Sequence, residues 1–296
     1  MENTAFDRKK TIIYLVFTFA VSWAAMAGVT ALYWNGLMLF GQLALMGVMF
    51  VPMLGVLVAR GGFSKVGWKP RFKRNIKWIL LAWFLPSLFT ALGAVLFFLI
   101  FPWRFDVSGA VMNEIAGMPD ALEQMGAQGL SFPLYIVIML VATLTYAPMI
   151  NTFPSVGEEV GWRGFLYPQL KARFGKTKGR LLGGVIWGLW HCPLIWTIGY
   201  EYGSDYFGFP FLGMLIFCVF TVSLGILLDI VYEKSESIWL PSLAHGAVNA
   251  AATLPLIFVT SAEDPTRLLG PVPNGLIASL PLIAASILVL WRENKK

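Results

Sequence analysis

The sequence predicts an all-α protein, a polytopic membrane bundle of about eight transmembrane helices with both termini in the cytoplasm. Of its 296 residues, 57% are hydrophobic and 13% are charged, whereas about a quarter of a typical soluble domain is charged. Uncharged runs are also long: residues 11–34 contain no Asp, Glu, Lys or Arg, and a spanning helix needs about 20 apolar residues. We therefore expect residues 1–296 to form a single integral-membrane domain.

Eight apolar segments follow one another along the chain. Inside lipid only helices and closed barrels satisfy their backbone hydrogen bonds, and these continuous runs lack the alternation of barrel strands. In chain order the expected spans are 11–34, 36–59, 78–102, 134–154, 181–200, 211–232, 238–258 and 274–291. The uncharged stretch around the fourth span, 124–157, is too long for one upright helix, and Pro148 and Pro154 are expected to break or kink it.

Basic residues gather on one side of this predicted membrane. With a cytoplasmic N-terminus, 20 of the 22 Lys and Arg residues lie at cytoplasmic ends and loops, while Glu201, Asp205 and other acidic residues lie outside. The positive-inside rule produces this asymmetry. The net charge of +6 then reflects topology and contact with the lipid bilayer, and indicates no nucleic-acid partner.

The only two histidines occupy predicted spans. His191 lies about ten residues into the fifth span and His245 about seven into the seventh, roughly 15 and 10 Å along a helix. A titratable side chain at such depth indicates a functional site. Asn249 follows His245 by four residues and shares its helical face, so the pair could stabilise a developing negative charge as an oxyanion hole does.

The stretch VGEEVGWRGFLYP, residues 156–168, places two adjacent carboxylates in an apolar setting. Glu159 has Arg163 at the spacing that favours an ion pair. Glu158 points about 100° away on a helix and is free for another partner. A desolvated carboxylate beside a histidine suits a general base, and we assign that role to Glu158.

Each of these residues also has a structural interpretation. A histidine within a span commonly hydrogen-bonds a neighbouring helix, and Glu159 with Arg163 is best explained as a structural ion pair. Asp229, near the cytoplasmic end of the sixth span, is expected to snorkel or to cap its helix. The convergence of both histidines, the Glu–Glu pair and Asn249 on residues 155–250 favours a functional site.

At these residues the sequence resembles the CPBP intramembrane proteases, which include CAAX prenyl endopeptidases and bacteriocin-related (Abi) proteins. The family carries a Glu-Glu-x3-Arg block, a Phe-x3-His block and a His-x3-Asn block on successive membrane helices. Here they read EEVGWR (158–163), WGLWH (187–191) and HGAVN (245–249). Trp187 replaces the family's Phe, and the resemblance covers about 155–250.

The resemblance implies an intramembrane endopeptidase with a site open to the cytoplasmic side. Glu158 and His191 would activate a water molecule, His245 and Asn249 would stabilise the oxyanion, and Glu159 and Arg163 would support them. Related proteins are often called metalloproteases, but we expect no cofactor, because the sequence has no HExxH motif and Asn249 beside His245 suits oxyanion binding better than metal ligation. In the alternative, Glu158, His191 and His245 would bind zinc as a three-ligand site.

Two other functions fit parts of the sequence. The protein could be a non-catalytic membrane protein that binds a peptide, of the bacteriocin-immunity type, or a proton-coupled transporter, since buried Glu and His also form proton relays. The protease interpretation predicts a peptide or protein substrate and, from the compact loops, a bacterial plasma membrane, with the endoplasmic reticulum as the eukaryotic alternative. The oligomeric state is left open.

Overall fold

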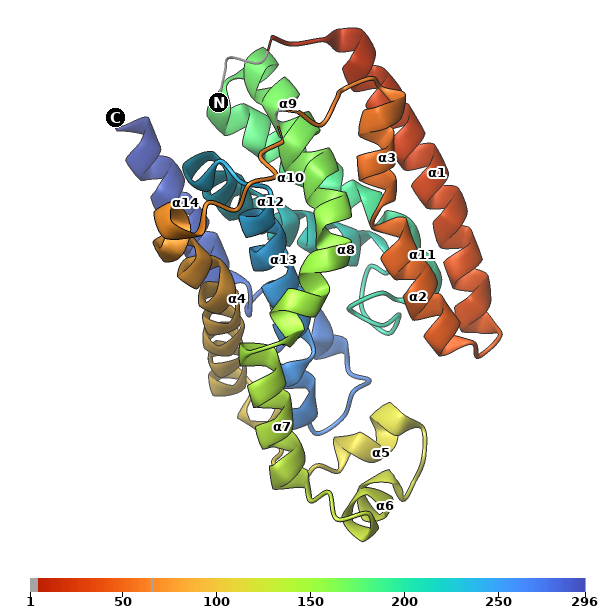
Figure 1. Cartoon of the computed structure of the whole chain (residues 1–296). Helices are drawn as coiled ribbons and strands as arrows, with labels where there is room; N and C mark the ends of the chain where they lie inside the picture. Colours follow the sequence, from red (N-terminus) through yellow and green to blue (C-terminus); the bar gives the residue numbers. More distant parts are fainter. Residues whose placement is uncertain (1–4, 65, 296) are drawn as a thin grey trace.

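A computed structural model describes residues 5–64 and 66–295 of the chain. The fold of these residues is all-α, as predicted, and the described part contains no β-strand longer than one isolated bridge (Figure 1). Lys65 and Lys296, two of the basic residues assigned to the cytoplasmic side, lie outside the described part. Five segments are long and apolar enough to cross a membrane: Arg8–Trp34 (α1), Met38–Val58, Phe72–Ile100 (α4), Lys176–Ile198 and Phe211–Ser235 (α12).

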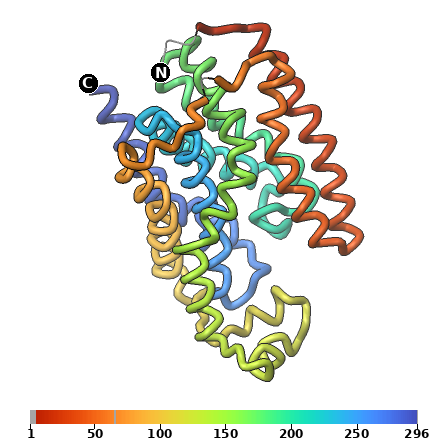
Figure 2. The backbone as a smooth tube through the Cα atoms, in the orientation of Figure 1, coloured from red at the N-terminus to blue at the C-terminus, as the bar shows by residue number. Residues whose placement is uncertain are grey.

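Two of these five segments each consist of two consecutive helices. The first comprises Met38–Val48 (α2) and Val51–Val58 (α3), and the second comprises Lys176–Trp190 (α10) and Cys192–Ile198 (α11). The chain is therefore a multi-pass membrane protein, and eight spans remains a prediction. Both termini lie at the same end of the bundle (Figure 2), which an even number of crossings requires.

The centre of the bundle is the contact between α8 (Ala147–Gly161) and α13 (Trp239–Ala252), the most extensive between any two helices of the described chain. Gly246 permits it, because a Cβ there would lie 2.6 Å from the backbone nitrogen of Thr152. Around this pair, α1 to α3 cover one flank, α4 and α14 (Leu280–Asn294) cover the opposite flank, and α10 packs on α12 (Figure 1).

The fourth predicted span is broken directly before Pro148. Helix α7 (Phe132–Leu144) ends and α8 begins on either side of Thr145 and Tyr146. Pro148 lies in the first turn of α8, where its missing N–H costs nothing, and Pro154 lies within α8 without ending it. The predicted break is present beside Pro148, which cannot donate to the carbonyl of Leu144, whereas Pro154 does not end its helix.

Helix α8 continues into α9 (Tyr167–Phe174) through a π-helical turn, Trp162–Leu166. The backbone N–H of Tyr167 donates to the carbonyl of Trp162, five residues earlier. Such turns hold an extra residue and are frequent at functional sites. This one separates the part of the helix with Glu158 and Glu159 from the part that reaches the basic end of the bundle.

The last two predicted spans are shorter as helices. Residues 238–258 contain α13, which ends at Ala252, and residues 274–291 contain α14, which begins at Leu280. Irregular chain joins them and folds back toward the centre of the bundle. The remaining short helices, on the side away from the termini, are Pro102–Arg104 (η1), Val111–Ala116 (α5), Ala121–Ala127 (α6), Leu254–Phe258 (η3) and Pro265–Leu268 (η4).

A network of ion pairs joins four helices at the end of the bundle that carries the termini. Asp229 on α12 is fully buried and accepts from Lys171 Nζ at 2.7 Å and Arg180 Nε at 2.6 Å. Glu233 bonds the same two cations, and Arg180 also contacts Glu293 of α14. The sequence suggested that Asp229 snorkels or caps its helix, and this prediction was wrong. Asp229 stays buried because two cations, from α9 and α10, compensate its charge.

Glu236, directly after α12, bonds Arg71 and Arg74 at the start of α4. Hydrogen bonds from Arg74 and then Arg71 lower the pKa of its carboxyl from 4.5 to about 2. A carboxyl with a depressed pKa contributes stability above its unfolded pKa and loses it as the pH falls toward the folded value. We expect Glu236→Gln to lower the melting temperature at pH 7. The decrease should be small, because these ion pairs are exposed to solvent. The difference in melting temperature from wild type should shrink below pH 4.5.

Thermal melting of the detergent-solubilised protein from pH 7 to pH 3 measures this. Glu123→Gln, an exposed acidic residue on α6, is the control and should track wild type at every pH. A Glu236→Gln deficit that stays constant with pH would contradict the assignment.

Candidate functional site

The four residues to which the sequence assigns chemistry line one cavity. Glu158 of α8, His191 at the end of α10, and His245 and Asn249 of α13 surround a space of about 90 Å³. This volume holds several water molecules. The geometry therefore permits a hydrolytic site.

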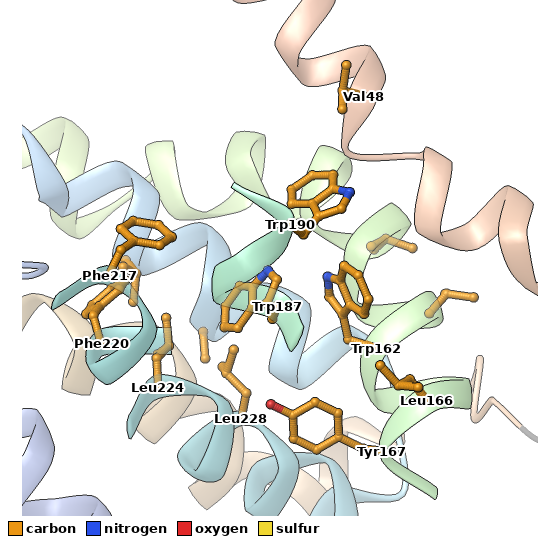
Figure 3. Close-up of a cluster of buried hydrophobic side chains, with 14 of the residues drawn as sticks. Val48, Trp162, Leu166, Tyr167, Trp187, Trp190, Phe217, Phe220, Leu224 and Leu228 are labelled. Atoms are coloured by element: carbon orange, nitrogen blue, oxygen red, sulfur yellow. The ribbon is translucent and has the colours of Figure 1, made fainter. Parts of the chain in front are cut away.

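Glu158 is held by one of its two carboxylate oxygens. Its Oε2 accepts from Trp187 Nε1 at 2.7 Å and from Trp162 Nε1 at 3.1 Å, and the side chain is 2% exposed. Within the described residues its Oε1 has no hydrogen-bond partner on the protein. Figure 3 shows Trp162 and Trp187 beside Trp190 in the buried cluster around the site. One oxygen is thus fixed, and the other remains available to a molecule in the cavity.

The ring of His191 is oriented by α10 itself. Its Nδ1 lies 3.0 Å from the carbonyl oxygen of Trp187, which can only accept, so Nδ1 carries a hydrogen and Nε2 is the second functional nitrogen. Trp190 packs edge-on against the ring and Phe217 packs on it at a tilt, each with centroids 4.7 Å apart. The ring has little freedom to turn.

Glu159 bonds two partners, of which the sequence predicted one. The expected pair with Arg163 is present, with Nη1 to Oε1 at 2.9 Å, and both side chains are fully buried. The same Oε1 accepts from His245 Nδ1 at 2.9 Å. The carboxylate beside a histidine is therefore Glu159 rather than Glu158, and His245 directs Nε2 away from this bond.

The guanidinium of Arg163 lies between two aromatic rings. Its Cζ is 4.4 Å from the centroid of Trp187 and 4.8 Å from that of Tyr167. A cation over an aromatic face is stabilised by the ring's quadrupole, which partly replaces the lost hydration. Arg163 and Trp187 together close the side of the site that faces α9.

Asn249 shares the helical face of His245 and, unlike it, is exposed. The cavity is therefore accessible beside Asn249, where Leu45 and Met49 at the end of α2 form the opposite wall. The predicted stacking of Asn249 one turn beyond His245 is present, and its amide is free to contact a bound molecule.

The zinc alternative does not fit this arrangement. In the described chain, no three His, Cys, Asp or Glu side chains lie close enough together to hold a metal ion. A zinc ion bound by Glu158, His191 and His245 would require these side chains to move.

Polar residues from two irregular segments also line the cavity, and the sequence did not suggest them. Tyr200 and Glu201 come from the segment between α11 and α12, and Asn274 comes from the segment before α14. The sequence assigned Glu201 to the acidic residues outside the membrane. Neither its spacing nor its neighbours reveal that this segment folds back to the site.

Comparison with known proteins matches the part of the chain that builds the site. Residues 129–251 match the model of the Rce1-like family, described as type II CAAX prenyl endopeptidases. A CAAX prenyl protease 2 from Methanococcus maripaludis is 32% identical over 93 residues, 31% of this chain and 34% of the relative, so the match spans about a third of that protein. The family match contains α8, α10 and most of α13, with all four proposed catalytic residues. Over this central segment, the chain is similar to the Rce1-like family of type II CAAX prenyl endopeptidases.

Proposed function

We propose that this protein is an intramembrane endopeptidase that hydrolyses a peptide bond with a water molecule activated by Glu158 and His191. The observation that carries the proposal is the state of the Glu158 carboxylate. Two indole donors hold Oε2, while Oε1 has no protein partner among the described residues and lines the cavity that His191, His245 and Asn249 share. A general base needs such an oxygen within reach of a bound water.

The reaction follows from these positions. Water held between Glu158 and His191 Nε2 loses a proton to one of them as its oxygen attacks the carbonyl carbon of the substrate. The resulting oxyanion accepts from the Asn249 amide and from His245 Nε2 when that nitrogen is protonated, because Nδ1 is engaged with Glu159. The proton taken from water passes to the leaving nitrogen as the carbon–nitrogen bond breaks.

The site is proposed to lie in the cytoplasmic half of the membrane. His245 follows the first residue of α13 by six positions, about 9 Å along the helix, and that end of α13 lies toward the basic end of the bundle. A membrane-bound or membrane-associated peptide or protein is the proposed substrate, approaching from the cytoplasmic side. The plasma membrane of a bacterium is the proposed location.

A peptide library tests the function. Wild type and His191→Phe, each in detergent or liposomes, are incubated with prenylated and unprenylated peptides, and the products are identified by mass spectrometry. Cleavage by wild type that His191→Phe lacks supports the proposal and shows which bond is cut. Equal cleavage by both, or binding of peptides without cleavage by wild type, would favour the peptide-binding protein instead.

Trp187→Phe, which restores the family's residue, tests the anchoring of Glu158. It removes the 2.7 Å hydrogen bond to Oε2 and leaves only that from Trp162. A hydrogen bond to a charged group contributes roughly 1.5–3 kcal/mol, so we expect kcat to fall about tenfold or more.

Trp190→Phe is the matched control for this substitution. Trp190 is equally buried and lines the same cavity, but its Nε1 has no hydrogen-bond partner in the described structure. Its replacement changes packing alone and should reduce kcat much less. If both substitutions lower kcat equally, the indole hydrogen bond does not position Glu158.

A further inference from the structure

The cavity that Glu158 lines carries a second carboxylate, that of Glu201. It lies in the segment 199–210 that joins α11 to α12, and it lines the cavity together with Tyr200 and Asn274. Its main-chain carbonyl accepts from Arg267 Nη2 at 3.1 Å. The proposed mechanism uses none of these residues.

Tyr200 connects this group to the catalytic cavity. Its ring is stacked on that of His191, with centroids 6.2 Å apart and planes inclined by 13°. Glu201 follows Tyr200 directly in the chain, and both residues line the cavity together with Asn274. The stacked Tyr200 ring therefore joins this segment to His191.

Asn274 adds an unpaired acceptor. The side chain is 4% exposed, and its Oδ1 has no hydrogen-bond partner among the described residues. Its own main-chain oxygen accepts from the Tyr202 hydroxyl at 2.8 Å, which fixes the residue in place. A buried acceptor without a donor is costly, so a ligand that brings N–H groups would be favoured here.

Arg267 lies beside Glu201 and its charge acts on the carboxylate, but its hydrogen bond goes to the main-chain oxygen of Glu201. Among the described residues, no Lys, Arg or His lies within ion-pair distance of the carboxylate itself. A carboxylate in apolar surroundings is stabilised by a cation that also donates hydrogen bonds. A substrate carboxylate would be repelled from the same place.

From this geometry we propose that Glu201, Asn274 and Tyr200 form a subsite for a cationic side chain of the substrate, a lysine or an arginine close to the scissile bond. The subsite rests on the proposed endopeptidase function. The subsite predicts a preference for a positively charged side chain at one position of the peptide. This preference adds to any selection of apolar side chains by the apolar walls of the cavity.

Peptides that differ in one residue test the subsite. Lysine, norleucine or glutamate is placed in turn at each of the two positions on either side of the bond that wild type cuts, and kcat/KM is measured. Wild type should favour lysine over norleucine about tenfold or more at one position, the usual strength of a charge-assisted hydrogen bond, and should cut the glutamate peptide most slowly.

Three variants identify the group responsible. Glu201→Gln keeps the size of the side chain and should reduce the lysine preference to about threefold or less, with the lysine peptide losing far more than the norleucine peptide. Glu201→Asp, which keeps the charge, should retain part of the preference. Asp205→Asn, an exposed acid in the same segment, should behave as wild type.

A parallel binding measurement separates failure of the subsite from failure of the protease. Fluorescence anisotropy gives the affinity of wild type and Glu201→Gln for the same peptides without any reaction. No cleavage together with lysine-selective, Glu201-dependent binding would refute the endopeptidase and leave the subsite standing. Equal losses for all peptides in Glu201→Gln, or no lysine preference in either assay, would overturn the subsite.

Discussion

Glu158→Gln is expected to lower kcat by about 10²- to 10⁴-fold, the range that general base catalysis contributes, while the fold and peptide binding stay intact. Glutamine has the shape of glutamate, and its carbonyl oxygen can still accept from Trp187 and Trp162. What it lacks is a basic oxygen on the cavity side. The loss should therefore appear in kcat, with little change in KM.

Single-turnover cleavage of the best library peptide measures this effect. Melting temperature and peptide affinity are recorded for each variant, so that misfolding is recognised. Glu158→Asp is an informative companion: it keeps the charge but withdraws the oxygen by one methylene, and should be intermediate. A Glu158→Gln enzyme with wild-type kcat would show that the base lies elsewhere.

Asp229→Asn is expected to destabilise the protein by about 3–5 kcal/mol, the usual cost of removing one partner of a buried ion pair. Lys171 and Arg180 both contact this fully buried carboxylate, at 2.7 and 2.6 Å. Asparagine would leave their charge incompletely compensated. Since the three residues join α9, α10 and α12, the effect should be on global stability rather than on the chemistry.

Unfolding of the purified protein by SDS titration measures the loss. Glu293→Gln serves as a graded control, because this carboxylate is 24% exposed and, among the described residues, forms an ion pair with Arg180 only. Its removal should therefore cost clearly less. If the two substitutions cost the same, solvent rather than the buried network compensates these cations.

Local spacing predicted the contacts that lie within one helix. Glu159 and Arg163 are four residues apart on one helix and form the expected pair, and the i, i+4 relation of His245 and Asn249 places both at the cavity. The helical character of the chain followed from its uncharged runs in the same way. These predictions needed only the period of the helix and the thickness of a bilayer.

Contacts between helices required the structure. The partner of His245 is Glu159 and not Glu158, a distinction that depends on how α8 is rotated against α13. Trp187, interpreted as a packing residue in a Phe position, donates to Glu158 through an indole nitrogen that Phe lacks.

The sequence also did not predict which irregular segments line the cavity. Glu201 and Asn274 are separated by more than 70 positions, and charge alone assigned Glu201 to the outer surface. Hydropathy locates membrane helices well, but it carries no signal for a connecting segment that turns back into the bundle.

The π-helical turn between α8 and α9 sets the direction in which side chains before it point relative to side chains after it, along one continuous helical segment. On one side of it, Glu158 and Glu159 face the cavity and His245; on the other, Lys171 faces Asp229. Each residue of an α-helix advances the rotation by about 100°. An uninterrupted α-helix with the same residues would turn Lys171 about 100° away from Asp229 whenever Glu158 faced the cavity. The π-helical turn absorbs one residue and so lets a single helix present both side chains correctly.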